Sequence, residues 1–197
     1  MKLVLASGNA GKLGELRDLL GCHGFDLVAQ GELGIDDIAE TATTFVENAL
    51  LKARHAARLS GLPALADDSG LCVDALGGAP GLRSARYAGP HGDAAANRAK
   101  LLEALAGQPG HARTAHFHCS VVVLHSADDP APLIAEGRWH GRILDAPRGD
   151  RGFGYDPLFF DPAEGLGAGE MDPALKNRIS HRGRALASLL RLLDRRD

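Results

Sequence analysis

Short hydrophobic runs alternate with amphipathic segments along the first third of the chain. Leucines recur at helical spacing up to Leu20, and Thr44 followed by Glu47 is typical of a helix-capping box. The pattern predicts strands at 2–6, 26–29 and 64–66, and helices up to Leu20 and over 44–60. Strands that alternate with helices in this way indicate an α/β fold.

The middle and the end of the chain follow a different pattern. It predicts a helix over 93–106, strands over 113–125 and 133–144, and a final helix over 183–195. We therefore expect the α/β fold class with a mixed central sheet and flanking helices. No repeat, low-complexity tract or linker interrupts the sequence, so residues 1–197 are expected to form a single domain.

The composition of the chain limits the kinds of molecule that it is expected to bind. The formal net charge is −3, which argues against a broad nucleic-acid-binding face because such a face makes a domain basic. A few cations in one cleft could still bind a small anionic molecule. No apolar run approaches the roughly 20 residues of a membrane span or the apolar core of a secretory signal. We expect no nucleic-acid or membrane partner.

The cysteines indicate the compartment. Cys22, Cys72 and Cys119 are odd in number and widely spaced, which favours reduced, mostly buried thiols in a cytoplasmic protein. His116 and His118 lie beside Cys119, but alternation along a strand places both histidines on one face and the cysteine on the other. A structural strand is therefore favoured over a zinc site.

The segment Ser7–Lys12 (SGNAGK) lies where a strand gives way to a helix. Glycines let backbone amides approach a phosphate, a helix N-terminus offers unpaired N–H groups, and Lys12 adds a full charge. A P-loop would need glycine in place of Ala6 and Ser or Thr in place of Leu13, so this is not a Walker-type site. Phosphate binding and an ordinary Gly-Asn turn with a solvated lysine both fit.

The pair Asp67-Asp68 directly follows the apolar run 64–66, and Ser69-Gly70 favour a turn there, so we expect the strand to end at this point. Neighbouring residues of a strand point to opposite sides, so one carboxylate would face a ligand. That carboxylate could lie beside phosphates if Mg²⁺ lay between them. A turn with both aspartates in solvent fits equally.

Lys52 interrupts the pattern of the predicted helix 44–60. A helical wheel places Phe45, Ala49, Ala53 and Ala56 on one arc, with Lys52 at the edge of that arc instead of among the other charges. A lysine at this position either extends along the apolar surface to reach solvent or points into a cleft. The wheel alone leaves both open.

Two later segments carry further candidate chemistry. The turn Gly152–Pro157 (GFGYDP) places an aromatic ring between glycines, where it could stack on a base or be buried in an ordinary turn. The run 176–184 (KNRISHRGR) gathers positive charge before the final helix. Because a helix N-terminus favours anions, such a run points to an anionic or carbonyl-bearing ligand.

Six motifs in order resemble the inosine/xanthosine triphosphate pyrophosphatase family, which removes non-standard purine nucleoside triphosphates. They cover essentially the whole chain: SGNAGK (7–12), TFVENALLKA (44–53), ADDSGLCVDALGGAPG (66–81), SARYAG (84–89), FGYDP (153–157) and SHRGRAL (180–186). The resemblance implies an elongated α/β fold with two lobes around a nucleotide cleft, usually as a homodimer. It also implies Mg²⁺-assisted hydrolysis of dITP, ITP or XTP to the monophosphate and pyrophosphate.

The resemblance assigns roles to particular residues. Asp68 would be a metal ligand and the base that activates water, Glu40 a second metal ligand, and Lys52 would face the phosphates, with Ser69 beside the nucleotide. The triphosphate cradle would comprise Ser7, Gly8, Asn9, Ala10, Gly11 and Lys12. The base pocket would comprise Phe153, Gly154, Tyr155, Asp156, Lys176, His181 and Arg182.

Base discrimination is expected to depend on Arg182. A guanidinium only donates hydrogen bonds, so it satisfies a purine 6-oxo group and not a 6-amino group. Two alternatives remain. One is a septum-inhibitor-like nucleotide pyrophosphatase with another base preference, against which SHRGRAL argues. The other is a non-catalytic nucleotide-binding protein, which would be expected to lack the Asp68 carboxylate.

Overall fold

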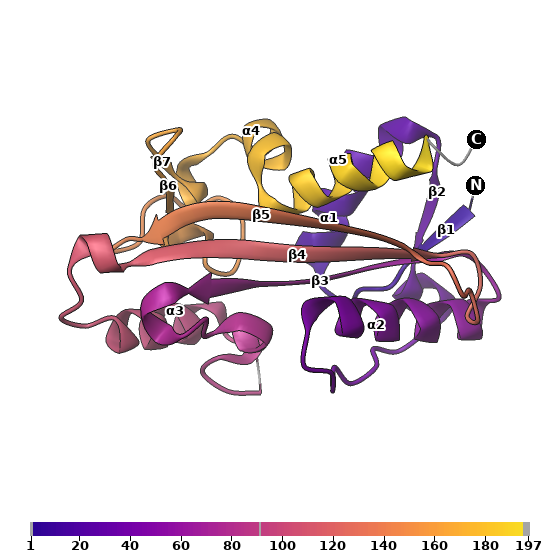
Figure 1. Ribbon diagram of the computed structural model, residues 1–197, viewed down its shortest axis with the longest axis horizontal. Helices are drawn as coiled ribbons and strands as arrows, with labels where there is room; N and C mark the ends of the chain where they lie inside the picture. The colour runs from indigo at the N-terminus through magenta and orange to yellow at the C-terminus, as the bar shows by residue number, and fades with distance from the viewer. Residues whose placement is uncertain (1, 91, 195–197) are drawn as a thin grey trace. The chain divides into compact units, whose positions relative to one another are not determined.

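The computed structural model describes residues 2–90 and 92–194, without the side chain of Cys22. In this part of the chain one sheet has the strand order β2-β1-β3-β4-β5-β6-β7 (Figure 1). Its strands are β1 Lys2–Leu5, β2 Asp26–Ala29, β3 Ala64–Val73, β4 Thr114–Leu124, β5 Leu133–Ile143, β6 Phe159–Asp161 and β7 Leu166–Gly167. The α-helices are α1 Ala10–Leu20, α2 Phe45–Ser60, α3 Ala94–Ala104, α4 Pro173–Ile179 and α5 His181–Leu193.

The sheet is mixed. Strand β1 pairs in parallel with β2 and β3, whereas β6 pairs antiparallel with β5 and β7. The predicted α/β class with a mixed sheet is therefore confirmed. The final helix was expected over 183–195; α5 begins at His181 instead, and residue 195 lies outside the described residues. The sequence pattern did not predict α4.

The chain divides into two compact units. The first unit comprises the described residues of 1–68, 119–137 and 182–197, and the second comprises those of 69–118 and 138–181. Strands β3, β4 and β5 contribute residues to both.

In the first unit, the sheet has a hydrophobic core on each face. Alternate residues of β1 and β3 point to opposite sides, so Leu5 and Leu65 enter one core while Ala64 and Ala66 enter the other. Figure 1 shows α1 and α5 on one side of these strands and α2 on the other. The first core includes side chains from α1 and α5, and the second packs small residues of α2: Ala49, Ala53, Ala56 and Ala57.

The second unit has a core rich in aromatic rings. Phe117, Trp139 and Phe159 come from three strands, and the Phe117 and Phe159 ring centroids are 4.7 Å apart. Trp139 donates through Nε1 to Asp161 Oδ2 at 2.7 Å, so its one polar atom is satisfied inside the core. Leu101 and Leu105 pack α3 and its end against the same core.

Strand β3 corrects the sequence analysis. We expected the strand to end at Ala66, but it continues to Val73 and carries Asp67, Asp68 and Ser69 within it. Both carboxylates are buried. The alternative of a turn with both aspartates in solvent is therefore wrong, because cations from distant parts of the chain pair with both charges.

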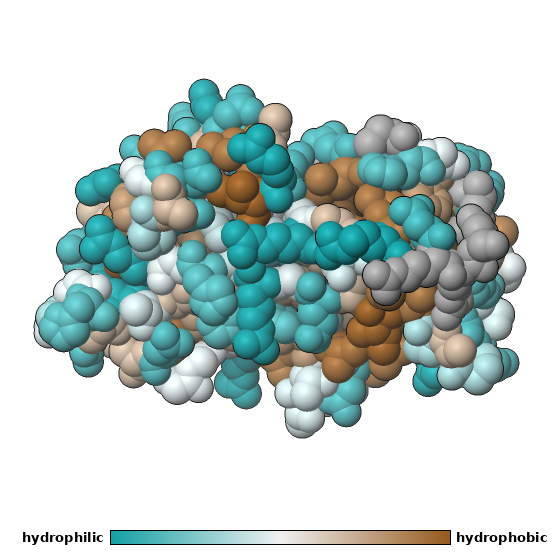
Figure 2. All heavy atoms as spheres, turned by 45° about the horizontal axis from the view of Figure 1, so that its top comes forward, coloured by the Kyte–Doolittle hydropathy of each residue, from teal (hydrophilic) through white to brown (hydrophobic). Residues whose placement is uncertain are grey.

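Over the residues that the structure describes, exposed large hydrophobic side chains are scattered. Figure 2 shows hydrophilic and hydrophobic patches interspersed on one face. The large hydrophobic residues that are exposed in the described part come from separate segments: Leu33, Leu59, Ile134 and Leu166. Among the helices within 2–90 and 92–194, none has both the length and the hydropathy needed to cross a bilayer.

The cysteine predictions are met in part. Cys119 is buried and Cys72 is half-buried, and both are free thiols, whereas the side chain of Cys22 lies outside the described residues. Cys119 Sγ lies 3.9 Å from Asp67 Oδ2. The ring of His116 lies beside the ring of His140, with 5.5 Å between the two centroids.

Candidate active site

The segment Ser7–Lys12 connects β1 to α1. Asn9 caps α1: its Oδ1 accepts from the Lys12 amide at 3.1 Å, and its own amide donates to Ser7 Oγ at 3.2 Å. Ala10 and Gly11 occupy the first turn, where the helix supplies no carbonyl for their amides. The first turn contains no acidic residue of its own, and the nearby carboxylates come from Asp37 and Asp67.

Gly8 has a structural reason to be glycine that the sequence analysis missed. A Cβ at this position would collide with Oδ2 of Asp37. The other carboxylate oxygen of Asp37 accepts a hydrogen bond from Gln30 Nε2, which restrains the side chain. A side chain at this position would therefore have to displace the exposed Asp37 carboxylate from its hydrogen bond to Gln30.

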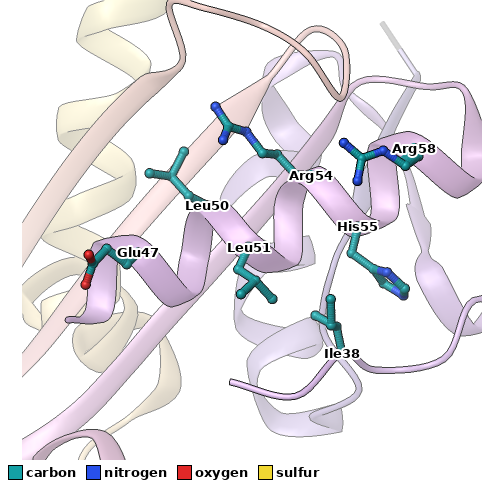
Figure 3. Close-up of a pocket in the computed structure, with 7 residues that line it drawn as sticks. All are labelled: Ile38, Glu47, Leu50, Leu51, Arg54, His55 and Arg58. Carbon is teal, nitrogen blue, oxygen red and sulfur yellow. The ribbon is translucent and has the colours of Figure 1, made fainter. Parts of the chain in front are cut away.

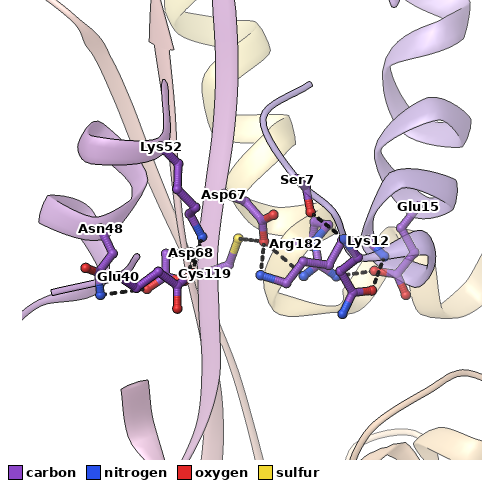
Figure 4. A network of polar contacts seen from close by, with 11 residues as sticks. Ser7, Lys12, Glu15, Glu40, Asn48, Lys52, Asp67, Asp68, Cys119 and Arg182 are labelled. Carbon is purple, nitrogen blue, oxygen red and sulfur yellow. Dashed lines mark hydrogen bonds and ion pairs between the residues drawn. The ribbon is translucent and has the colours of Figure 1, made fainter. Parts of the chain in front are cut away.

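Asp67 and Asp68 point to opposite sides of β3 (Figure 4). Asp67 Oδ2 lies 3.1 Å from Lys12 Nζ and 3.0 Å from Arg182 Nη2. Asp68 Oδ1 lies 2.9 Å from Lys52 Nζ. Adjacent carboxylates thus pair with different cations, as expected from the alternation of strand side chains. Because Lys12 contacts a buried carboxylate, it is not the solvated lysine of an ordinary turn.

Lys52 points inward from α2. Its Nζ contacts both Asp68 Oδ1 and, at 2.8 Å, Glu40 Oε1, and only 13% of its side chain is exposed. The predicted capping box positions the helix, since Thr44 Oγ1 accepts from the Glu47 amide at 3.3 Å and donates to Glu47 Oε2 at 2.6 Å. Of the two orientations that the helical wheel left open, the structure has the inward one.

Burial shapes the protonation of this cluster. Burial raises the pKa of Asp68 above its usual value, an effect that Lys52 opposes and Glu40 reinforces. Burial by itself would lower the pKa of Lys52, but the charges of Asp68, Asp67 and Glu40 outweigh it and raise that pKa. Lys52 therefore stays charged between carboxylates, and Asp68 is a stronger base than an exposed aspartate.

Glu40 and Asp68 form a donor set that suits Mg²⁺. Their carboxylate oxygens contact the same Lys52 nitrogen and hence lie close together. In the described part of the chain, no group of three or more His, Cys, Asp or Glu residues is arranged to hold a metal. Two carboxylates are sufficient for Mg²⁺, which keeps several waters and commonly takes its other ligands from substrate phosphates.

Asp67 belongs to a second charged cluster. Burial alone would raise the pKa of Asp67, but Lys12 and Arg182 hold it well below its usual range. Arg182 Nη1 contacts Glu15 Oε2, and only 1% of the Arg182 side chain is exposed. Burial would lower the pKa of Arg182, yet Asp67 and Glu15 raise it, so Arg182 stays charged.

Three of the predicted base-pocket residues meet within the second unit. Asp156 Oδ2 accepts from Lys176 Nζ at 2.6 Å and from the Phe153 amide at 2.8 Å, while Lys176 Nζ lies 4.9 Å from the Phe153 ring centroid. Both Asp156 and Lys176 are buried. Gly152 has φ +74°, and a Cβ there would collide with Asp156 Oδ2.

The neighbouring predicted residues are held by contacts from elsewhere in that unit. Tyr155 donates its hydroxyl to the Ser84 carbonyl at 2.9 Å, and Arg98 Nη1 donates to the Gly154 carbonyl at 2.8 Å. The His181 ring stacks on Phe117 with 4.7 Å between centroids.

The structure thus brings the predicted residues into separate groups. In the first unit, Glu40, Lys52 and Asp68 form one cluster, and Lys12 meets Arg182 at Asp67. Ser69 is half-buried in β3. Three residues that contact these groups were not predicted from the sequence: Glu15, Asn48 and Arg98. Glu15 lies three positions after Lys12 on α1, a spacing that places both on one helical face and could have indicated it.

A hollow of about 480 Å³ lies along a different surface of α2 (Figure 3). It is lined by Ile38, Glu47, Leu50, Leu51, Arg54, His55 and Arg58. None of the residues predicted to bind nucleotide or metal lines it, so the hollow is not the predicted site.

Comparison with known proteins identifies the family. A model described as the Ham1 family matches residues 3–192. The chain belongs to the Ham1 family. A "dITP/XTP pyrophosphatase" of Xanthomonas campestris pv. campestris (strain 8004) is 65% identical over 95% of this chain and 94% of that protein. One of Vibrio cholerae with the same name is 52% identical over 98% of this chain and 96% of its own length.

Solved structures agree with this membership. A "HAM1 protein from Coxiella burnetii" is 49% identical, has a TM-score of 0.91 and covers 99% of both chains. The "Staphylococcus aureus Ham1 protein" is 35% identical, with a TM-score of 0.87 and full coverage of both chains. The resemblance inferred from the six motifs is confirmed, and the mixed sheet is that of the Ham1 family.

Proposed function

We propose that this Ham1 family protein hydrolyses the non-standard purine nucleoside triphosphates dITP, ITP and XTP to the monophosphate and pyrophosphate, and so cleanses the nucleotide pool. The observation that carries the proposal is the cluster of buried Asp68 with the partly buried Lys52 and Glu40, which combines a base, a cation and a second carboxylate. Relatives up to 65% identical carry the name dITP/XTP pyrophosphatase.

Asp68 is the proposed base. Its raised pKa makes it a better proton acceptor than an exposed aspartate, and it would take a proton from the water that attacks the α–β phosphoanhydride. Lys52, 2.9 Å away, orients this carboxylate and stabilises negative charge on the phosphates. Asn48 Nδ2 lies 3.4 Å from Asp68 Oδ2 and supports the same side chain.

Glu40 and Asp68 are the proposed ligands of Mg²⁺. When bound, the ion would neutralise phosphate charge and lower the pKa of a bound water. The protein's own contribution is to hold both carboxylates close together through Lys52. Without a cation between them, their mutual repulsion would raise the cost of burying them.

The phosphates are proposed to bind at the N-terminus of α1. The first-turn amides of Ala10 and Gly11, with the side chain of Lys12, supply positive potential there. Ser7, Gly8 and Asn9 form the turn that presents these groups. Phosphoryl-type chemistry requires mainly positioning and charge stabilisation from the protein, and this segment can supply both.

The purine base is proposed to be recognised by hydrogen-bond donors and by an aromatic ring. Arg182 in the first unit contacts Glu15 through Nη1 and Asp67 through Nη2, and its remaining N–H donors suit a 6-oxo purine and not a 6-amino purine. In the second unit, Phe153 can stack on a purine while Asp156 and Lys176 hold its turn. A mismatched buried polar group can be worth about 10⁴-fold in specificity.

We further propose a cytoplasmic homodimer. The dimer follows from family resemblance, and the location from a substrate that belongs to the nucleotide pool and from the free thiols of Cys72 and Cys119. Light scattering of the purified protein tests the dimer, and a single-copy mass contradicts it.

The decisive experiment is a nucleotide panel with product identification. Purified protein with Mg²⁺ should convert dITP, ITP and XTP to monophosphate and pyrophosphate, and should act poorly on ATP. Release of orthophosphate would overturn the α–β cleavage. Preference for another base would favour a septum-inhibitor-like activity, and binding without turnover would favour a non-catalytic nucleotide-binding protein.

A further inference from the structure

One buried oxygen of β3 is shared by two cations that come from opposite ends of the chain. Oδ2 of Asp67 lies 3.1 Å from Lys12 Nζ and 3.0 Å from Arg182 Nη2 (Figure 4). Lys12 belongs to the first turn of α1, and Arg182 belongs to the first turn of α5. The Asp67 side chain is 0% exposed and the Arg182 side chain is 1% exposed, so this ion pair is closed off from solvent in the structure.

The arrangement requires the negative charge of this carboxylate. Two cations that approach one point repel each other, and the repulsion is strong where water is excluded. Glu15 balances part of the charge of Arg182 from the other side, but Asp67 is the carboxylate that joins Arg182 to Lys12. Removing that charge would leave both cations without the anchor they share.

We propose that Asp67 is a positioning residue that sets Lys12 and Arg182 together, so that triphosphate binding and base discrimination depend on one carboxylate. The proposal rests on the proposed function, in which Lys12 serves the phosphates and Arg182 the base. It assigns Asp67 a role distinct from that of Asp68, which faces the other side of the same strand and contacts Lys52.

The test compares kcat/KM for ITP and for ATP in a small set of variants. Asp67→Asn keeps the side-chain size and removes the charge. We expect kcat/KM for ITP to fall on the order of 100-fold, because small misplacements of binding groups have effects of this size. The ITP:ATP ratio should fall about tenfold as Arg182 loses its fixed orientation.

Two further variants separate the effect of Asp67 on triphosphate binding from its effect on base discrimination. Lys12→Met should lower kcat/KM for ITP and ATP equally and leave their ratio unchanged. Arg182→Gln should lower the ratio, and adding Asp67→Asn to it should lower the ratio no further, since Asp67 acts on selectivity through Arg182. Asp18→Asn, which removes an exposed carboxylate from α1, is the matched control and should match the parent protein.

A folding defect in Asp67→Asn would not end the test. The double variant Lys12→Met with Asp67→Asn removes one positive and one negative charge together, so it leaves fewer unbalanced buried charges. Compared with Lys12→Met alone, it should show the same tenfold loss of the ITP:ATP ratio. Thermal melting identifies which variants are folded.

The outcomes are distinguishable. An unchanged ITP:ATP ratio in folded Asp67→Asn, and in the double variant relative to Lys12→Met, overturns the positioning role even if activity falls. If the double variant Asp67→Asn with Arg182→Gln loses more of the ITP:ATP ratio than Arg182→Gln alone, Asp67 does not act on selectivity through Arg182. If the parent protein does not hydrolyse ITP, the proposed function is wrong. The positioning role of Asp67 can then still be tested, by comparing the affinities of the same variants for ITP and ATP in calorimetry.

Discussion

Lys52→Met is the most informative single substitution in the Asp68 cluster. Methionine keeps the length and flexibility of the side chain and removes the charge that lies 2.9 Å from Asp68 Oδ1 and 2.8 Å from Glu40 Oε1. The two carboxylates then face each other without a cation between them. We expect the free energy of unfolding to fall and the protein to depend more strongly on added Mg²⁺.

The size of the loss follows from the geometry. Two unit charges at 2.9 Å attract by about 6 kcal/mol at an effective dielectric constant of about 20, and the cost of burying the ammonium offsets part of this. Removing one partner of a buried pair costs about 3–5 kcal/mol. Because the Glu40 side chain is 23% exposed, water can solvate it, so we expect about 3 kcal/mol, or roughly 6–12 °C in melting temperature.

Thermal melting without metal and with excess Mg²⁺ measures both effects. Mg²⁺ should raise the melting temperature of Lys52→Met more than that of the parent protein, since only the variant lacks a cation between the carboxylates. Lys2→Met removes an exposed lysine at the start of β1 and is the matched control. A variant that melts like the parent, or equal Mg²⁺ shifts in both, would refute the reasoning.

Three further predictions concern other residues. Asp68→Asn should abolish turnover at an unchanged circular dichroism spectrum, and an active variant would remove Asp68 from the base role. Arg182→Gln should erode the preference for ITP over ATP in competition assays; an unchanged preference would move base recognition elsewhere. Gly8→Ala should destabilise the protein by about 0.5–1.5 kcal/mol in urea unfolding, because its Cβ would displace Asp37 from its hydrogen bond to Gln30, whereas Gly14→Ala, with open space around its Cβ, should not.

Local patterns predicted the helices that have strong end signals. Thr44 and Glu47 mark the start of α2, and the arc of alanines predicted its buried face. Helix α4 was missed because it has only seven residues, fewer than a periodic pattern needs to be visible. Its N-cap Asp172 followed by Pro173 was the one local signal available.

The sequence singled out the cations of the two charged clusters, but not their pairings. Motif resemblance selected Lys12, Lys52, Asp68 and Arg182, but it did not predict which carboxylate each cation contacts. Those contacts join residues that are distant in sequence, and no local pattern contains them. The same distant cations let β3 continue through Asp67, which composition alone suggests is a turn.

The packing beside these carboxylates has a consequence for the register of β3. A slip by one residue would put one aspartate in the place of the other and would move the second one position along the strand, away from the cations that it now contacts. Leu65 would also enter the interface where Ala64 and Ala66 meet the small residues of α2. That interface has no room for a leucine without displacing the helix. The alanines of α2 therefore add to the ion pairs in fixing which carboxylate reaches Lys52, and so protect this cluster from an error in strand alignment.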